Sequence, residues 1–286
     1  MSKSNIDNQV GKKYGRLTIK SLFISNKRTR CVAICECGDE KDYALQSLKS
    51  GLTKSCGCIR KERNNGSVYY YNEDFFDTLT EKSAYVIGLI YTDGYLSKNG
   101  RRFVISLQES DKHILEEIGM LIRNSKDVKF FSRISKKNPD KLINGYYIAC
   151  NNNRLCSSLI RYGVYNNKTN TISPSNLLIN NRHFWRGCID GDGGISLLMN
   201  KYLGLNFGGT KQMVDGFINF INLYINYNSK YRYVKNLYQR IYLTGKNAKT
   251  IYHILYDNSN ISINRKNKYM EYAKLENIIA FDSFNI

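Results

Sequence analysis

The sequence predicts an α+β fold in which one αββαββα unit occurs twice, after a small separate N-terminal module. Three observations predict this fold. Two segments that align without gaps end in Asp-Gly, at Asp93 and at Asp192, which lie 99 residues apart. The same order of helical and alternating stretches follows both segments. Five of the eight cysteines crowd into residues 31–58, among short β-like runs and glycine turns.

The expected domain boundaries follow from changes in amino-acid composition along the chain. Residues 1–60 form the N-terminal module, and the polar stretch 61–79, rich in Asn and Tyr, is expected to be a linker. Residues 80–286 form the main domain, with repeat one at 80–179 and repeat two at 180–286.

In repeat one, Thr80 is placed to cap a helix over 81–93 that stops at Gly94. Phe103, Ile105 and Leu107 alternate with polar residues, which is the period of a half-buried strand. The predicted elements after the first helix are strands at 95–97 and 102–108, a helix at 111–121, strands at 128–136 and 146–151, and a helix at 154–162.

Repeat two begins near Arg182, and its first helix ends at Asp192-Gly193. The predicted elements after it are strands at 194–198 and 203–207, a helix at 214–225, strands at 231–235 and 238–244, and a helix at 248–255. The order matches repeat one, which indicates a tandem duplication.

Small residues recur in register on the two leading helices. Gly88 and Thr92 share one face of the first helix, and Gly187 and Gly191 share the same face of the second. A glycine inside a helix costs about 1 kcal/mol relative to alanine, a cost that is sensible where two backbones must approach closely. We therefore expect the two helices to pack on one another.

This packing would bring two carboxylates together at two helix C-termini. Each terminus already carries partial negative charge, and neighbouring carboxylates repel. Mg²⁺, which prefers carboxylate and phosphate oxygens, would relieve both penalties. Asp93 and Asp192 are therefore the predicted Mg²⁺ ligands, and the predicted chemistry is phosphodiester hydrolysis.

The charge points to nucleic acid. Lys and Arg number 43 against 24 Asp and Glu, a formal net charge of +19, which favours a polyanionic partner. No apolar run approaches the roughly 20 residues of a membrane span, and the N-terminus lacks a signal-peptide core. We expect double-stranded DNA as the partner, no membrane association, and a cytoplasmic, intracellular location with a phage or bacterial source.

From these motifs the chain resembles the LAGLIDADG homing endonucleases over residues 80–286. The motifs read Ile87-Gly-Leu-Ile-Tyr-Thr-Asp-Gly94 and Arg186-Gly-Cys-Ile-Asp-Gly-Asp-Gly193. The resemblance implies that Asp93 and Asp192 bind the catalytic metal. It also implies two saddle-shaped sheets astride DNA, and cleavage across the minor groove that leaves short 3′ overhangs. Tyr91 stands where the family often has Asp, whereas Asp190 keeps that residue.

Family members usually add a basic residue near each metal site. The segments Tyr165-Asn-Asn-Lys168-Thr169 and Ile263-Asn-Arg-Lys266 look similar to those carriers. Lys168 and Lys266 are therefore expected to stabilise charge that develops on the scissile phosphate.

The sheet faces opposite the helices are expected to contact DNA. Alternation and hairpin position select basic and aromatic residues for groove and phosphate contact. In repeat one these residues are Lys98, Arg101, Arg102 and Arg133, and Phe131 shares the face of Arg133. In repeat two they are Lys230, Arg232, Tyr238, Arg240 and Tyr242.

Two cysteine pairs in the N-terminal module predict structural zinc. Cys35 and Cys37 are followed, after 18 residues, by Cys56 and Cys58. Four thiolates satisfy tetrahedral Zn²⁺, and a unit this small often needs a metal to fold. Cys31 is a possible substitute ligand. The stretch from Leu48 to Cys58 resembles cysteine-rich DNA-binding modules attached to phage homing enzymes, so we expect a zinc-ribbon-like module.

The sequence thus predicts a monomeric, Mg²⁺-dependent, site-specific double-strand DNA endonuclease of the intron-homing kind. Two alternatives stay open: an RNA maturase on the same scaffold, with intron RNA as its partner, and a non-catalytic DNA-binding regulator. Retention of both Asp93 and Asp192 argues against the regulator.

Overall fold

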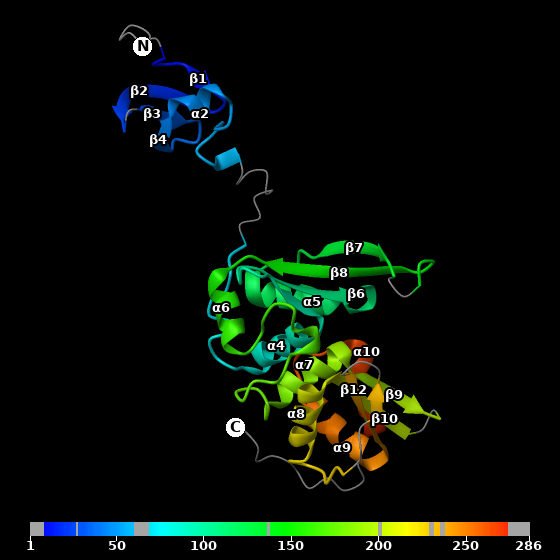
Figure 1. Cartoon of the computed structure of the whole chain (residues 1–286). Helices are drawn as coiled ribbons and strands as arrows, with labels where there is room; N and C mark the ends of the chain where they lie inside the picture. The colour runs from blue at the N-terminus through cyan, green and yellow to red at the C-terminus, as the bar shows by residue number, and fades with distance from the viewer. Residues whose placement is uncertain are drawn as a thin grey trace. The chain divides into compact units, whose positions relative to one another are not determined.

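The computed structural model describes residues 9–26, 28–59, 69–135, 138–199, 202–228, 232–234 and 238–273. The chain divides into two compact units, Met1–Tyr69 and Tyr70–Ile286, and each has its own core (Figure 1).

The first unit is a small antiparallel sheet with one short helix. Its elements are β1 (Lys13–Tyr14), β2 (Leu17–Ser25), β3 (Arg28–Cys35), β4 (Glu40–Ala44) and α2 (Leu45–Lys49). The strands follow one another in order across the sheet. Leu17, Ile19, Cys31 and Ala33 are buried on one face of this sheet, together with Leu48 of α2.

Repeat one opens the second unit. Its elements are α4 (Glu81–Asp93), β5 (Gly94–Leu96), β6 (Phe103–Gln108), η1 (Glu109–Asp111), α5 (Lys112–Arg123), β7 (Lys129–Ile134), β8 (Leu142–Cys150), α6 (Asn153–Arg161) and η2 (Lys168–Asn170). The four strands form one antiparallel sheet in the order β5-β6-β8-β7.

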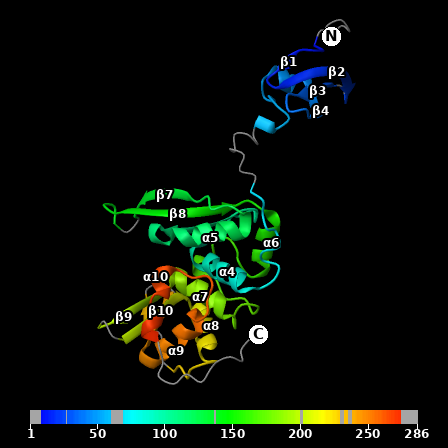
Figure 2. The same cartoon turned by 180° about the vertical axis from the view of Figure 1, so that it is seen from behind.

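Repeat two has the same order of leading elements. They are α7 (Arg182–Asp192), β9 (Gly194–Leu198), β10 (Tyr202–Thr210), α8 (Lys211–Ile221), β11 (Arg232–Val234), β12 (Tyr238–Thr244) and α9 (Gly245–Tyr256), followed by α10 (Asn264–Asn267) and α11 (Met270–Ala273). Its sheet order, β9-β10-β12-β11, is that of repeat one. The predicted α+β fold with two fused αββαββα repeats is confirmed. In both views α4 and α7 lie between the two sheets (Figures 1 and 2).

The start of α4 is set by its sequence. Thr80 accepts a hydrogen bond from the backbone N–H of Ser83, and the Ser83 hydroxyl accepts one from the N–H of Thr80. This reciprocal capping box satisfies two donors that a helix start would otherwise leave unpaired. The helix begins at Glu81, as predicted.

The segment before α4 differs from the expectation. Residues 61–79 were expected to link two domains, and 61–68 lie outside the described residues. Residues 70–79 instead pack onto repeat one, because Phe76 is fully buried in its core and Asp77 pairs with Arg154 and Arg161 of α6. Several polar residues here thus bind α6 and the end of β8: Asp74 also pairs with Arg154, and Glu73 accepts a hydrogen bond from Asn152.

Several element ends also differ from the prediction. β8 begins at Leu142 because it continues as a hairpin arm past its buried part, whereas β10 extends to Thr210 because its last residues still pair with β12. α8 begins at Lys211, where the Thr210 side chain caps it by accepting from the N–H of Met213. None of the helices in the described ranges combines the length and the apolar composition needed to cross a lipid bilayer.

Candidate active site

The backbones of α4 and α7 touch at two glycines. A Cβ atom at Gly88 would overlap the backbone oxygen of Phe184, and one at Gly187 would overlap that of Tyr85. One turn later, a Cβ atom at Gly191 would overlap Oγ1 of Thr92 and lie 2.6 Å from Oδ2 of Asp93. The structure therefore brings together the four small residues expected to pack, and the two helix ends are adjacent.

The sequence suggests that the glycine after each acid caps the helix, but the structure gives these two glycines a different role. Gly94 and Gly193 are extended, with φ of −94° and −83°, and do not form left-handed helix caps. A Cβ atom at Gly94 would lie 2.5 Å from Cα of Ile90, and one at Gly193 would lie 2.7 Å from the backbone oxygen of Ile189. Glycine lets each helix turn directly into a strand, which fixes the position of the preceding aspartate.

Asp93 and Asp192 lie at these adjacent ends. Burial, and then the charge of Asp192, raise the pKa of Asp93 to about 7, while Lys266 and Lys168 oppose the rise. Asp192 is exposed to solvent, yet desolvation by the surrounding protein still raises its pKa, against the charges of Lys168, Lys266 and Arg240. The two acids thus interact electrostatically in a partly desolvated site.

Lys168 and Lys266 lie beside the ends of the two leading helices. Both side chains are buried. Lys168 Nζ donates to the backbone oxygen of Gly94 at 2.8 Å, and Lys266 Nζ donates to that of Gly193 at 2.8 Å. Each lysine therefore contacts the residue that follows the acid of its own repeat. Burial lowers the pKa of Lys168, and it lowers that of Lys266 to about 8.

The two segments that carry Lys168 and Lys266 are held in place by different contacts. In α7 the buried Asp190 carboxylate accepts from the N–H of Ile263 at 2.8 Å and from the Tyr256 hydroxyl at 2.6 Å. In α4 the matching residue is Tyr91, whose hydroxyl donates to the backbone oxygen of Tyr162 at 2.6 Å. Both residues fix the chain that leads to the lysine. Neither lies at the site of the two terminal acids, so the departure at Tyr91 leaves that pair intact.

The residues at the helix ends fit Mg²⁺. Burial and the charge of Asp192 raise the pKa of Asp93. A divalent cation bound between the two carboxylates would replace the proton and relieve their repulsion. Carboxylate oxygens with room for water on the exposed side are the donor set that Mg²⁺ prefers.

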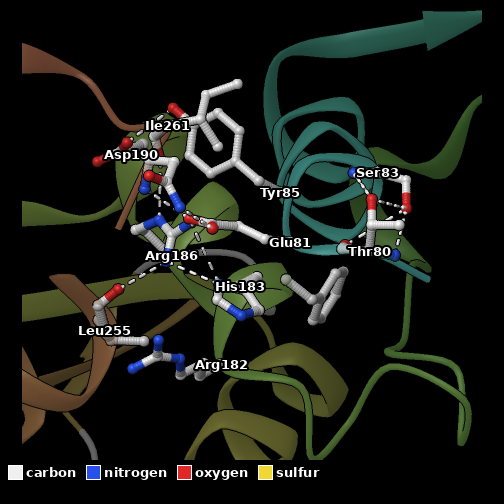
Figure 3. Close-up of polar contacts among 12 residues, drawn as sticks. Thr80, Glu81, Ser83, Tyr85, Arg182, His183, Arg186, Asp190, Leu255 and Ile261 are labelled. Atoms are coloured by element: carbon white, nitrogen blue, oxygen red, sulfur yellow. Dashed lines mark hydrogen bonds and ion pairs between the residues drawn. The ribbon is translucent and has the colours of Figure 1, made fainter. Parts of the chain in front are cut away.

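A buried polar network, which the sequence reasoning missed, joins the two repeats on another side of the helix pair (Figure 3). Arg186 of α7 donates to Glu81 of α4 at 2.7 Å, and Glu81 also accepts from the N–H and side chain of Asn260. Although burial opposes it, the hydrogen bonds from Asn260 and the charge of Arg186 lower the pKa of Glu81. The signal available in the sequence was Arg186, a charged residue that directly follows the apolar pair Phe184-Trp185.

In repeat one the candidate DNA contacts lie on exposed parts of the sheet. Lys98, Arg101 and Arg102 are exposed in the hairpin between β5 and β6. Arg133 is exposed on β7, where its guanidinium lies 5.4 Å from the centre of the Phe131 ring. The shared face of these two residues is as expected from their alternation.

In repeat two, Tyr238, Arg240 and Tyr242 alternate with the buried Gln239, Ile241 and Leu243 along β12, so they face away from the core. Arg240 is close enough to Asp192 to lower its pKa, and the buried Nε of Arg240 has no hydrogen-bond partner among the described residues. Arg232 pairs with Arg240 through the backbone of β11. Lys230 lies outside the described residues.

The four predicted zinc ligands form one cluster in the first unit. Their Sγ atoms all lie within 4.8 Å of one another, with Cys35 to Cys58 at 3.5 Å and Cys37 to Cys56 at 3.3 Å. Hydrogen bonds from the backbone of Cys37 and Cys56 lower the pKa of Cys35 to about 6. Cys31 is not part of the cluster, because its thiol is buried and donates to the backbone oxygen of Tyr43. The cluster fits a tetrahedral metal ion.

Comparisons with known proteins find similarity in structure. No protein-family model matches the sequence, and no curated protein matches it. The homing endonuclease I-WcaI bound to its DNA recognition sequence is similar, with a TM-score of 0.47 and 19% identity over 72% of this chain and 92% of that one. Meganuclease I-CpaMI bound to uncleaved DNA gives 0.43, with 11% identity over 68% of this chain and 90% of that one. The LAGLIDADG homing endonuclease I-LtrWI bound to target DNA gives 0.41, with 11% identity over 70% and 89%.

Proposed function

We propose that this chain is a site-specific double-strand DNA endonuclease of the LAGLIDADG, intron-homing kind, with Mg²⁺ held between Asp93 and Asp192. One observation carries the proposal. Two duplicated helices pack through glycines so that their terminal acids are adjacent and interact electrostatically, beside the buried Lys168 and Lys266. A structural protein gains nothing from such a collection of poorly solvated charges.

The reaction is hydrolysis of a phosphodiester in each strand. The oxygen of a water molecule bonds to phosphorus, one ester P–O bond breaks, and the departing ester oxygen takes up a proton. Bound Mg²⁺ supplies a lowered pKa for water and stabilises charge on the phosphate oxygens. Asp93 and Asp192 would hold the metal, and positive charge from the buried lysines would offset the negative charge that develops on the phosphate.

Both sheets belong to the recognition surface. Hairpin residues such as Lys98 and Arg101 suit the phosphate backbone, whereas Tyr238, Arg240 and Tyr242 suit a groove. The unsatisfied Nε of Arg240 supports a role in contacting a ligand. Since one chain supplies both repeats, the enzyme acts as a monomer, and its two unlike halves read a non-palindromic site.

The first unit serves as an auxiliary DNA-binding module stabilised by Zn²⁺ on Cys35, Cys37, Cys56 and Cys58. Its core consists of few apolar side chains around one short helix. A unit this small gains stability from a metal clip. The module extends the contact with DNA beyond the cleavage site.

The proposal is tested by selecting cleaved sites from a randomised duplex library with Mg²⁺, using the full chain. We expect one long sequence to be enriched, with breaks in both strands. On that site Asp192→Asn abolishes cleavage but retains duplex binding in a gel-shift titration, while the exposed Asp140→Asn changes neither. Absence of any enriched site, or tighter binding to structured RNA than to every duplex, would overturn the proposal.

A further inference from the structure

The basic side chains of the first unit divide into those that pair with acids and those that do not. Within the described part of this unit, each of the four acidic residues pairs with a basic one. The pairs are Lys13–Glu36, Lys20–Glu40, Arg30–Asp42 and Lys41–Asp39. The excess positive charge of the unit therefore lies on basic residues outside these pairs, and they show where a polyanion would bind.

The outward face of the small sheet, which points away from its core, is electrically balanced. The residues of β3 that alternate with its buried ones face outward, and Glu40 and Asp42 of β4 lie opposite two of them. Lys20 binds Glu40 and Arg30 binds Asp42, each at 2.6 Å. Since each cation here already has an anion, this face offers a polyanion little net attraction.

The opposite face is covered by α2 and by the turn that follows it, residues 47–55, which we call the basic turn. α2 joins the core of the sheet through Leu45 and Leu48. The basic turn contains two exposed lysines, Lys49 and Lys54, and no acid. Within the ranges that the structure describes, neither lysine forms an ion pair. Their charges are therefore available to a partner.

Hydrogen bonds hold the basic turn in place. Within it, the N–H of Thr53 donates to the backbone oxygen of Ser47 at 2.9 Å. Its end is tied to the start of β2, since the backbone oxygen of Lys54 accepts from the N–H of Arg16 at 2.8 Å. The cysteine cluster begins at the next residue but one. A surface ordered in advance loses little conformational entropy on binding.

Leu52 gives the basic turn an apolar centre. It lies between the two lysines in the sequence and is 84% exposed. A single exposed leucine is common on protein surfaces and means little alone. Between two cations it matches duplex DNA, where basic side chains bind phosphates and apolar ones contact sugars and base edges in a groove.

We propose that the basic turn is the surface through which the first unit binds duplex DNA, with Lys49 and Lys54 on phosphates and Leu52 in the groove. The inference rests on the proposed role of the first unit as a DNA-binding module. It goes beyond that role because it assigns the contact to one surface and leaves the outward face of the sheet without one.

The experiment measures binding of the full chain to a duplex that carries the selected site with long flanks, without Mg²⁺, over a range of salt concentrations. Lys49→Gln with Lys54→Gln removes two charges from the basic turn. We expect it to weaken binding and to reduce the slope of log Kd against log salt by about 2. Leu52→Ser should weaken binding with an unchanged slope.

The matched control removes two charges from the outward face, by Lys20→Gln with Arg30→Gln, and should leave the slope unchanged. Zinc content and thermal unfolding show that each variant keeps its fold.

Equal losses from the two double variants would mean that binding follows net charge alone and would overturn the inference. Wild-type binding by the variant of Lys49 and Lys54 would overturn it as well. If that variant loses its zinc, Leu52→Ser decides, because unchanged affinity there would contradict the assigned surface. A wild-type chain that binds no duplex would instead refute the proposed function, so the two failures are distinguishable.

Discussion

Asp93 combines burial with a like-charged neighbour, and both raise its pKa, to about 7. An aspartate in an unfolded chain ionises near pH 3.9, so the folded protein holds this proton more tightly. The contribution of Asp93 to stability is therefore present at low pH and is lost as the pH rises from about 4 to about 7. Without Mg²⁺, the ionised Asp93 therefore destabilises the folded protein above neutral pH.

A pH experiment follows at the scale of this residue. Asp93→Asn should raise the free energy of unfolding at pH 8, without added Mg²⁺, by about 1–3 kcal/mol, and should have little effect near pH 4. Urea unfolding at the two pH values measures the difference. Asp140→Asn, at an exposed position, is the matched control and should show no such dependence. An equal effect of Asp93→Asn at both pH values would contradict the electrostatic explanation.

The site residues that could be predicted from the sequence are those fixed by the periodicity of a helix or strand. The Asp-Gly motifs predicted the acids because helix register places them without knowledge of the rest of the fold. The hydrogen bonds of Lys266 to the end of α7 could not be predicted, because they join residues at least 73 positions apart in the sequence. The approach of Arg240 to Asp192 likewise depends on how β12 sits beside α7.

At the scale of elements, the close contact of α4 with α7 decides whether the two acids meet. Gly88→Ala places a Cβ atom into the backbone oxygen of Phe184, which has no flexible end to move aside. We expect a loss of about 1–3 kcal/mol in the free energy of unfolding, as for other overpacked interfaces. Gly209→Ala on β10 is the control, since its Cβ meets only the Met213 side chain, at 3.3 Å. Chemical denaturation measures the free energy of unfolding of both variants. Equal values for Gly88→Ala and Gly209→Ala would contradict the close helix contact.

The ion pair between Glu81 and Arg186 is a second contact that holds the two repeats together. Arg186 is fully buried, and it also donates to the backbone oxygens of Leu255 and Ile261. Arg186→Leu leaves a half-buried carboxylate and two carbonyls without this partner, so we expect a loss of about 3–5 kcal/mol. Arg161→Ala breaks an exposed pair with Asp77 and a contact with the Tyr162 ring, and should change stability by less than about 1 kcal/mol. Thermal unfolding of both variants measures this, and similar small losses would show that the buried pair contributes little.

Element types were predictable because hydrophobic period differs between helices and strands. The capping box at Thr80 also fixed one boundary. Strand ends were not predictable where β8 runs past the core as a hairpin arm, since alternation there is not enforced by burial. The packing of 70–79 was missed because a few anchors, Phe76 above all, order an otherwise polar segment.

For the whole molecule, duplication within one chain explains both the symmetry and the departures from it. A single chain can let its two halves diverge, as at Tyr91 and Asp190, while keeping the two helix ends adjacent. The first unit is independent in its core and is expected to be independent in its stability.

Zinc removal tests that independence. We expect one Zn²⁺ per chain, and chelation or Cys37→Ser should abolish the unfolding transition of the first unit while that of the second unit remains. Cys156→Ala, in α6, should keep the zinc. Metal analysis measures the bound zinc, and calorimetry measures the unfolding transitions of the two units. A chelated protein whose thermal profile is unchanged would rule out a structural metal.

The most direct test of a metal shared by the two repeats is a crystal structure of the full chain with its selected DNA site and Mn²⁺ in place of Mg²⁺. We expect anomalous signal within about 2.5 Å of a carboxylate oxygen of both Asp93 and Asp192, against the DNA backbone. Manganese bound elsewhere, or the two acids turned into separate pockets, would contradict the account.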